Sequence, residues 1–183
     1  DQVQMIDLVS ARSETYQYPT ALPTIKPGTI SDDLRRRDFT INTLAIRLDS
    51  EHFGELYNEM DGLGDLEHGL IRVLHQRSFV DDPTRIFRAV RYEQRFGFEI
   101  VPETLALITK SLPLVKKLSA ERLRHELDLV LEEPNAASIL ARLARLRIMR
   151  TIHSKMAWNQ AIQKRFENAL SIAPTVQRSL GWM

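Results

Sequence analysis

Two residues in this chain have the types and spacing needed to read the edge of a nucleobase. Asp82 and Arg85 are three residues apart in the first turn of a predicted helix, so their side chains face the same side. Asp82 offers carboxylate acceptors, and Arg85 offers a planar fork of donors. Asp81, directly before them, could hydrogen-bond Arg85 and fix its orientation. The alternative is a capping Asp in a local surface ion pair, which would contribute only about a few tenths of a kcal/mol.

The helix that carries this pair is predicted over residues 83–96. Asp82 can cap its first turn, and Pro83 suits the first helical position, where a missing N–H costs nothing. Four cations share one arc of this helix, namely Arg85, Arg88, Arg91 and Arg95. Guanidiniums placed this way repel one another unless an anion lies along them, so a ligand with phosphates is the natural candidate. An ordinary amphipathic helix with a solvated basic face is the alternative.

Arg37 and Asp38 end a second concentration of charge, the run of residues 35–38. Arginine donors beside an aspartate acceptor suit a nucleotide, because guanidinium binds phosphate and carboxylate binds ribose hydroxyls. A basic turn whose Asp38 caps the following helix would have the same sequence. This pattern alone does not decide between the two.

Composition limits the classes of protein that this chain can belong to. Its 183 residues are 43% hydrophobic and 27% charged, which is typical of a globular protein that buries a core. The net charge is only +1, so the basic residues indicate a local pocket rather than a coated surface. The absence of cysteine excludes disulfides and thiolate metal sites. No apolar run reaches membrane-spanning length, so we expect a cytoplasmic protein without a membrane partner.

The first part of the chain mixes strands, turns and short helices. A strand is predicted over residues 3–9, and a hairpin is predicted from residues 46–49 and 54–57. Between them, prolines indicate an irregular loop over residues 11–28, followed by a short turn capped from residues 31–33. A Gly-rich turn at residues 61–65 begins a short helix, and residues 71–74 are extended. We expect at most three strands within residues 1–74.

Helices alone are predicted after that part. Their expected ranges are 83–96, about 102–110, 119–132, 134–145 and 157–171. The fold class is therefore α+β. We expect two domains, a partial head with few strands over residues 1–74 and a helical neck with the start of a body over residues 75–183.

Four motifs, taken together and in order, resemble one family. The chain is similar to the class II (bacterial-type) tRNA nucleotidyltransferases, which add CCA or A, and to the related poly(A) polymerases. The segments that carry the resemblance are Leu34–Ala45, Asp61–Leu66 with Ile71–Leu74, Asp81–Tyr92 and Ser119–Leu127. Asp81 stands where the family more often has Glu.

The resemblance implies a role for each matching residue. Asp82 and Arg85 would read the base of the incoming CTP or ATP without a nucleic-acid template. Sugar and phosphate would be bound by Arg37 and Asp38, and the triphosphate by Arg88 and Arg91. Structural support would come from Asp81, Glu121 and Arg122, the last two bracing the neck. The partners would be the tRNA 3′ end and ATP and/or CTP, and the helical part would also bind RNA.

The same resemblance implies what the complete enzyme needs besides this chain. The family's Asp-x-Asp pair, which binds the catalytic Mg²⁺ ions, lies upstream of its equivalent of Asp1. We therefore expect an internal fragment of a nucleotidyltransferase that has no catalytic residue, binds no metal and is inactive alone. Exposed head edges would favour self-association.

Other functions fit the same residues. CCA addition, A addition and poly(A) synthesis would use the same pocket, so the sequence does not separate them. From a different class, the chain could be a non-catalytic RNA-binding or interaction module that has kept the fold.

Overall fold

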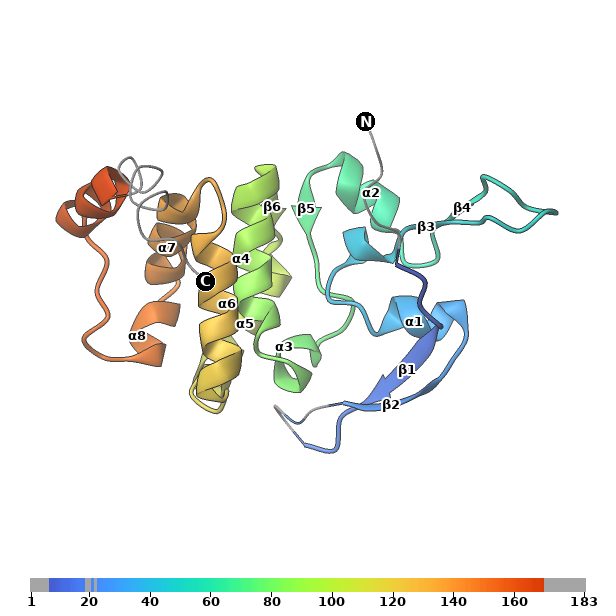
Figure 1. Ribbon diagram of the computed structural model, residues 1–183, viewed down its shortest axis with the longest axis horizontal. Coiled ribbons are helices and arrows are strands. Elements are labelled where there is room, and N and C mark those ends of the chain that lie inside the picture. Colours follow the sequence, from blue (N-terminus) through green and yellow to red (C-terminus); the bar gives the residue numbers. More distant parts are fainter. Residues whose placement is uncertain (1–6, 19–20, 22, 170–183) are drawn as a thin grey trace, which may run out of the picture.

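The computed structural model describes residues 7–18, 21 and 23–169. Short strands and helices lie at one end and helices alone at the other, which confirms the predicted α+β class (Figure 1). Residues 3–6 of the predicted first strand lie outside the described residues, and residues 7–9 adopt no regular structure. None of the described helices is long and apolar enough to cross a bilayer.

The proline-rich stretch forms a strand pair, so the prediction of an irregular loop was wrong. β1 (Arg12–Thr15) pairs antiparallel with β2 (Thr24–Pro27) in a two-stranded ribbon. Proline is tolerated there because Pro27 ends an edge strand, where its missing N–H removes no ladder bond. The ribbon packs on α1 (Ile30–Arg35) and so brings β1 beside the two charged motifs.

Helix α1 begins just before its predicted cap at residues 31–33. Thr29 is the cap, and its hydroxyl accepts a hydrogen bond from the Asp32 N–H at 3.2 Å, while the Asp32 carboxylate accepts one from the Thr29 N–H at 2.8 Å. Because Thr29 and Asp32 cap the helix, Asp33 does not take part in the cap, and it is buried. The 3₁₀ helix η1 (Thr40–Thr43) follows.

The predicted hairpin and Gly-rich helix are both present. β3 (Ala45–Ile46) and β4 (Leu56–Tyr57) pair antiparallel and project away from the other elements (Figure 1). α2 (Gly62–Glu67) packs against η1, and a Cβ at Gly62 would lie 2.2 Å from the Thr40 carbonyl oxygen, so only glycine fits. The hairpin exposes large apolar side chains such as Phe53, but the expected self-association stays a prediction.

A parallel strand pair joins the two parts of the chain. β5 (Leu70–Ile71) pairs with β6 (Glu99–Ile100), a strand that the sequence did not reveal. With β1 to β5 in the described part of residues 1–74, the expected limit of three strands was wrong.

The central helix starts later than predicted. A short helix, α3 (Ser78–Asp81), comes first, and Asp82 then turns to an extended conformation. α4 (Arg85–Phe96) follows, with Gly97 in the left-handed conformation at its end. The Asp82 carboxylate still accepts from the Thr84 N–H at 3.0 Å, so it caps the turn that leads into α4.

Four more helices complete the helical part. These are α5 (Pro102–Val115), α6 (Ala120–Leu131), α7 (Ala136–Arg145) and α8 (Ile148–Ile152). α5 runs five residues beyond its predicted end, and α8 was not predicted. The last predicted helix is present from residue 160 to residue 169, where the description of the chain ends.

One hydrophobic core holds both parts together. Fully buried Phe39 and Ile71 from the first part belong to the same cluster as Phe87 and Val90 of α4 and Leu143 of α7. Burying each such side chain contributes roughly 1.5–3 kcal/mol. The core therefore fixes α4 relative to α1 and η1, which carry the other charged motif.

Candidate nucleotide-binding site

Five of the six predicted nucleotide-binding residues line one polar hollow of about 340 Å³. It lies where β1, the end of α1, α4 and α6 meet. Its lining residues are Glu14, Tyr16, Arg36, Arg37, Asp38, Asp82, Thr84, Arg85, Arg88 and Glu126. The elements thus bring together the charged run that ends at Asp38 and the Asp82–Arg85 pair.

Asp82 and Arg85 are each held by neighbours that leave part of the side chain free to bind. Asp82 Oδ1 accepts from Arg122 at 2.6 Å and from the Thr84 hydroxyl at 2.7 Å. Asp82 Oδ2 has no hydrogen-bond partner among the described residues. Buried Arg85 donates to Ser78 Oγ at 2.9 Å and to the Arg36 carbonyl at 2.8 Å, which uses two of its five N–H groups. A fixed donor and a fixed acceptor therefore remain at the pocket.

Asp38, which lies just before η1, forms an ion pair with Arg88 of α4. Arg88 Nε donates to Asp38 Oδ2, and its guanidinium also lies over the Tyr92 ring, 5.5 Å from the centroid. Burial acts most strongly on Arg88 and lowers its pKa, but the attraction and hydrogen bond of Asp38 outweigh this, so the pKa is raised. Asn42 and the Phe39 N–H both bond the other oxygen of Asp38. Arg88 therefore stays charged at the pocket wall.

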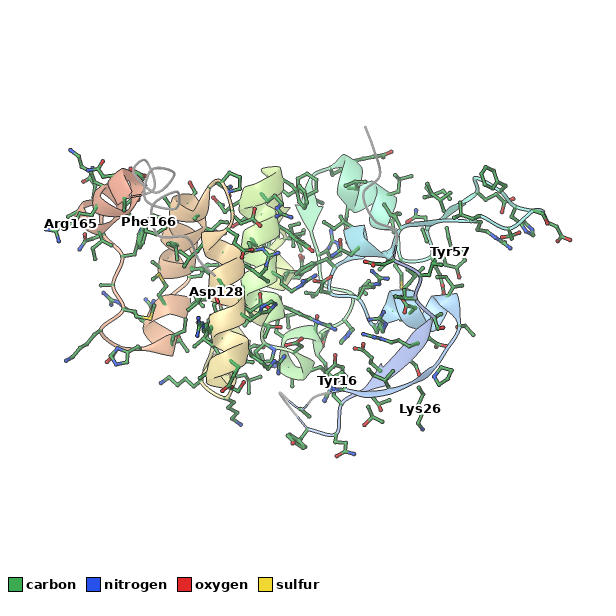
Figure 2. All side chains as sticks on the ribbon, viewed as in Figure 1. Tyr16, Lys26, Tyr57, Asp128, Arg165 and Phe166 are labelled. Carbon is green, nitrogen blue, oxygen red and sulfur yellow. The ribbon has the colours of Figure 1, made fainter. Side chains whose placement is uncertain are left out.

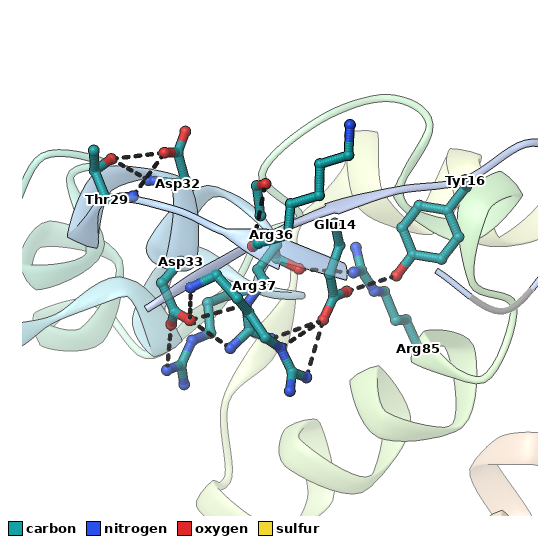
Figure 3. A network of polar contacts seen from close by, with 11 residues as sticks. Glu14, Tyr16, Thr29, Asp32, Asp33, Arg36, Arg37 and Arg85 are labelled. Carbon is teal, nitrogen blue, oxygen red and sulfur yellow. Dashed lines mark hydrogen bonds and ion pairs between the residues drawn. The ribbon is translucent and has the colours of Figure 1, made fainter. Parts of the chain in front are cut away.

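Strand β1 and the residue that follows it supply two pocket residues that the sequence did not indicate, Glu14 and Tyr16. Glu14 accepts hydrogen bonds from the Tyr16 hydroxyl at 3.1 Å and from Arg36 at 3.2 Å, and only 7% of its side chain is exposed (Figure 3). Arg36 is also held by Asp33 at 2.7 Å. Because the Arg36 carbonyl accepts from Arg85, Glu14 is linked to the orientation of Arg85. This link could not be predicted from the sequence, because residues 11–28 were expected to form an irregular loop. In a strand, by contrast, alternate side chains face the same side and can therefore face α1.

Tyr16, which is labelled in Figure 2, lines both this pocket and a smaller one of about 220 Å³. Burial raises the pKa of Tyr16 to about 12, so its hydroxyl keeps its proton and donates to Glu14. The smaller pocket also contains His75, and burial is the largest cause of its lowered pKa.

The structure does not support the predicted role of Asp81. Its carboxylate pairs with Arg77 at 3.2 Å within one turn, whereas Arg85 is held by Ser78 and the Arg36 carbonyl. The helical turn of α3 directs Asp81 toward Arg77 four residues earlier, which sequence adjacency could not show.

Arg91 does not line the pocket, so the structure does not support its predicted contact with a triphosphate. Its side chain is only 9% exposed, and Nε donates to Glu133 Oε1 at 3.1 Å. Glu133 is itself 2% exposed and also pairs with Arg95 at 2.7 Å. The residue belongs instead to a buried ion network between α4 and the end of α6.

The two predicted bracing residues of α6 behave differently. Arg122 ties α6 to Asp82, so it both braces the helix and holds a pocket residue. Glu121 is exposed, and hydrogen bonds from its own backbone N–H and from Ser119 lower its pKa. These contacts of Glu121 are confined to the start of α6.

A residue further along α6 was missed. Buried Glu126 lines the pocket, burial raises its pKa, and its Oε2 has no hydrogen-bond partner. Arg91 Nη1 lies 3.9 Å from this oxygen and also has no hydrogen-bond partner. Within the segment Ser119–Leu127, which contains Glu126, the resemblance implied roles only for Glu121 and Arg122.

The described residues do not provide a metal site. No group of three or more His, Cys, Asp or Glu side chains gathers in residues 7–18, 21 and 23–169 in a way that could hold an ion. The pocket lining offers carboxylate acceptors and guanidinium donors to a ligand that forms hydrogen bonds.

Two family models match this chain. The model of the "Poly A polymerase head domain" matches residues 1–72, and that of the "Probable RNA and SrmB- binding site of polymerase A" matches residues 97–158. Together the two models match more than half of the chain. The chain belongs to the poly(A) polymerase and tRNA nucleotidyltransferase family.

Individual relatives cover most of this chain. An A-adding tRNA nucleotidyltransferase of Geobacter sulfurreducens is 40% identical over 97% of this chain and 20% of its own length. A second A-adding enzyme, from Halalkalibacterium halodurans, is 42% identical over 80% of this chain and 35% of its own length. The chain therefore spans about a fifth to a third of the length of these curated relatives.

Solved structures show the same fold. An apo CCA-adding enzyme superposes with a TM-score of 0.89 at 39% identity, over 97% of this chain and 42% of that one. Other similar structures are CCA-adding enzymes in complex with ATP, with CTP and, for the Thermotoga maritima enzyme, with tRNA.

Proposed function

We propose that this chain is the nucleotide-selecting part of a tRNA nucleotidyltransferase. The complete enzyme would add CMP and/or AMP from CTP or ATP to the tRNA 3′ end without a nucleic-acid template. In that reaction the terminal hydroxyl oxygen of the tRNA bonds to the α-phosphorus, and pyrophosphate leaves. The observation that carries the proposal is that Asp82 and Arg85, each fixed by its neighbours, line one polar pocket.

Base selection follows from the groups that this pair leaves unpaired. A free carboxylate oxygen on Asp82 and the remaining N–H groups of Arg85 form an acceptor and a donor side by side. The Watson–Crick edges of cytosine and adenine both combine an amino donor with a ring-nitrogen acceptor, so one such pair can serve either base. The pocket is polar and its walls are held by ion pairs, which suits recognition by hydrogen bonds.

We propose that residues on the remaining wall of the pocket bind the sugar and the phosphates of the nucleotide. Arg37 is 41% exposed and keeps one contact, to Asp33 at 2.9 Å, so most of its donors are available to phosphate oxygens. Arg88 lies at the same pocket, while Asp38 can accept from a ribose hydroxyl. Arg91 is left out because it is buried in its own network.

Several features of the complete enzyme are part of the same proposal. Residues 1–74 would form part of the head, and residues 75–183 the neck and the start of the body. Mg²⁺ would be used by the complete enzyme, and the location would be the cytoplasm. Support comes from the family, whose curated members here are tRNA nucleotidyltransferases.

Nucleotide incorporation by the complete enzyme tests the proposal. Three tRNAs that end in no added residue, in C or in CC are each incubated with CTP, with ATP and with both. CCA addition extends all three, A addition extends only the tRNA that ends in CC, and a poly(A) polymerase extends a tail of many A residues. Failure to extend any of these RNAs would leave a non-catalytic RNA-binding module as the better account.

A further inference from the structure

Charged residues of α6 meet α4 one after another along its length. The two helices pack against each other (Figure 1). Arg122 donates to Asp82 at 2.6 Å, just before α4 begins, and Glu133 pairs with Arg95 at 2.7 Å, near the end of α4. Glu126 lies between these two contacts, one helical turn after Arg122. It therefore lies level with the middle of α4.

The carboxyl group of Glu126 forms no hydrogen bond within the described part of the chain. Its side chain is 8% exposed, and its Oε2 is buried without a partner. Arg91 Nη1 lies 3.9 Å from that oxygen, which is too long for a hydrogen bond. Burying a carboxyl group in this way costs free energy, and buried polar groups in folded proteins almost always have a partner. The unused carboxyl group of Glu126 is therefore available to a ligand.

This carboxyl group borders the nucleotide pocket. Glu126 lines the pocket together with Asp82 and Arg88. In the proposed function, Asp82 reads the base and Arg88 binds phosphate. Because the ribose joins the base to the phosphates in any nucleotide, a group that borders the pocket beside both residues meets the sugar. Ribose hydroxyls both donate and accept hydrogen bonds, so they can bind a carboxyl group in either protonation state.

Asp38 has too few free positions to bind both hydroxyls of a ribose. Its Oδ1 accepts from Asn42 and from the Phe39 N–H, and its Oδ2 accepts from Arg88. An ionised carboxylate has about four acceptor positions, so about one remains. Binding of both the 2′- and the 3′-hydroxyl therefore needs a second group at the pocket.

We propose that Glu126 binds one of the two ribose hydroxyls of the incoming nucleotide and so helps to select ribonucleotides over deoxynucleotides. This inference rests on the proposed function, because it takes the base to lie at Asp82 and the phosphates at Arg88. Burial raises the pKa of Glu126 against the attraction of Arg88 and Arg91. A carboxyl group that is partly neutral repels the neighbouring triphosphate less than a full carboxylate would.

Glu126→Leu tests this proposal without depending on catalysis. Leucine has a similar volume but no hydrogen-bonding group, and losing a buried carboxyl without a partner should not lower the unfolding midpoint. Calorimetric titration of the complete enzyme, in the absence of tRNA, measures the affinities for ATP, 2′-deoxyATP and 3′-deoxyATP. The wild type should prefer ATP to each analogue by about three- to tenfold, as expected for one hydrogen bond. In Glu126→Leu one of these preferences should disappear, and the other should remain.

Two further variants show whether the effect belongs to the hydrogen-bonding group of Glu126. Glu126→Gln keeps an acceptor and a donor, so it should retain part of the preference that Glu126→Leu loses. Glu132→Leu makes the same change at the exposed C-cap of α6, outside the pocket. It should leave both preferences as they are in the wild type.

Two unchanged preferences in Glu126→Leu would overturn the proposal, as would a wild type that binds ATP and both analogues equally. Equal weakening of all three nucleotides, together with a lower unfolding midpoint, would overturn it in favour of a structural contact with Arg91.

Asp82→Ala, titrated with ATP and with CTP, tests the proposed function separately. An unchanged base preference in that variant would refute base selection by Asp82. The hydroxyl preferences are measured on a single base, so their outcome for Glu126 does not depend on that result.

Discussion

Arg88 and Arg91 are one helical turn apart, but their side chains lie in different surroundings. Substituting them should therefore have different effects on stability and on nucleotide binding. Arg91→Met removes a charge that is 9% exposed and leaves Glu133, which is 2% exposed, with only Arg95. Breaking a buried ion pair costs about 3 kcal/mol or more. At about 2–4 °C per kcal/mol for a chain of this size, the midpoint of thermal unfolding should fall by about 6–12 °C.

Arg88→Met should show the opposite pattern. Its side chain is 34% exposed, so losing the pair with Asp38 should lower stability by only about 1 kcal/mol. If Arg88 binds phosphate, removal of a charge-assisted contact worth about 1.5–3 kcal/mol should weaken nucleotide binding roughly 10- to 100-fold.

Circular dichroism measures the unfolding midpoints, and calorimetric titration of the complete enzyme with ATP and with CTP measures the affinities. Arg95→Met serves as a control, since it removes the exposed partner of Glu133 and keeps the buried one. An Arg91→Met protein with normal stability and weakened nucleotide binding would refute the assignment of Arg91 to the core network.

Three further predictions follow from other contacts. Glu14→Gln should weaken the contact that holds Arg36, and thereby the position of Arg85. The ratio of ATP to CTP affinity should then change more than the unfolding midpoint does. An unchanged ratio would argue against the link from Glu14 to Arg85. Burial raises the pKa of Glu126, so its contribution to stability is full below the ordinary carboxyl pKa and is lost as pH rises past the raised value. Glu126→Gln should therefore unfold at a higher temperature than the wild type near pH 7, with the difference vanishing toward pH 4 in unfolding curves measured across pH. Gly62→Ala should lower the unfolding midpoint by several degrees, because the new Cβ would lie 2.2 Å from a carbonyl oxygen, and a normal midpoint would contradict that packing.

The sequence predicted the pocket better than it predicted the elements around it. Asp38, Asp82, Arg85 and Arg88 line one hollow because the same charged motifs that are visible in the sequence are fixed by one core. Helices with strong apolar periodicity, such as α7, were also found close to their predicted ranges.

What the sequence could not show depends on long-range contacts. Strand β6 has only two residues and exists because β5 lies beside it. Arg91 shares its arc with Arg88, but the approach of Glu133 from a distant segment buries it. Glu14 becomes a pocket residue only because β1 packs on α1. Periodicity and motif spacing describe one element at a time, so partners supplied by another element escape them.

The central claim is that Asp82 and Arg85 select the base. Its most direct test is the ratio of kcat/KM for ATP to that for CTP in the complete enzyme, compared between the wild type, Asp82→Ala and Arg85→Ala. A ratio is insensitive to a general loss of folded protein, since both nucleotides use the same pocket. We predict that both variants change this ratio by tenfold or more. Equal losses for both nucleotides, or no loss for either, would contradict the claim.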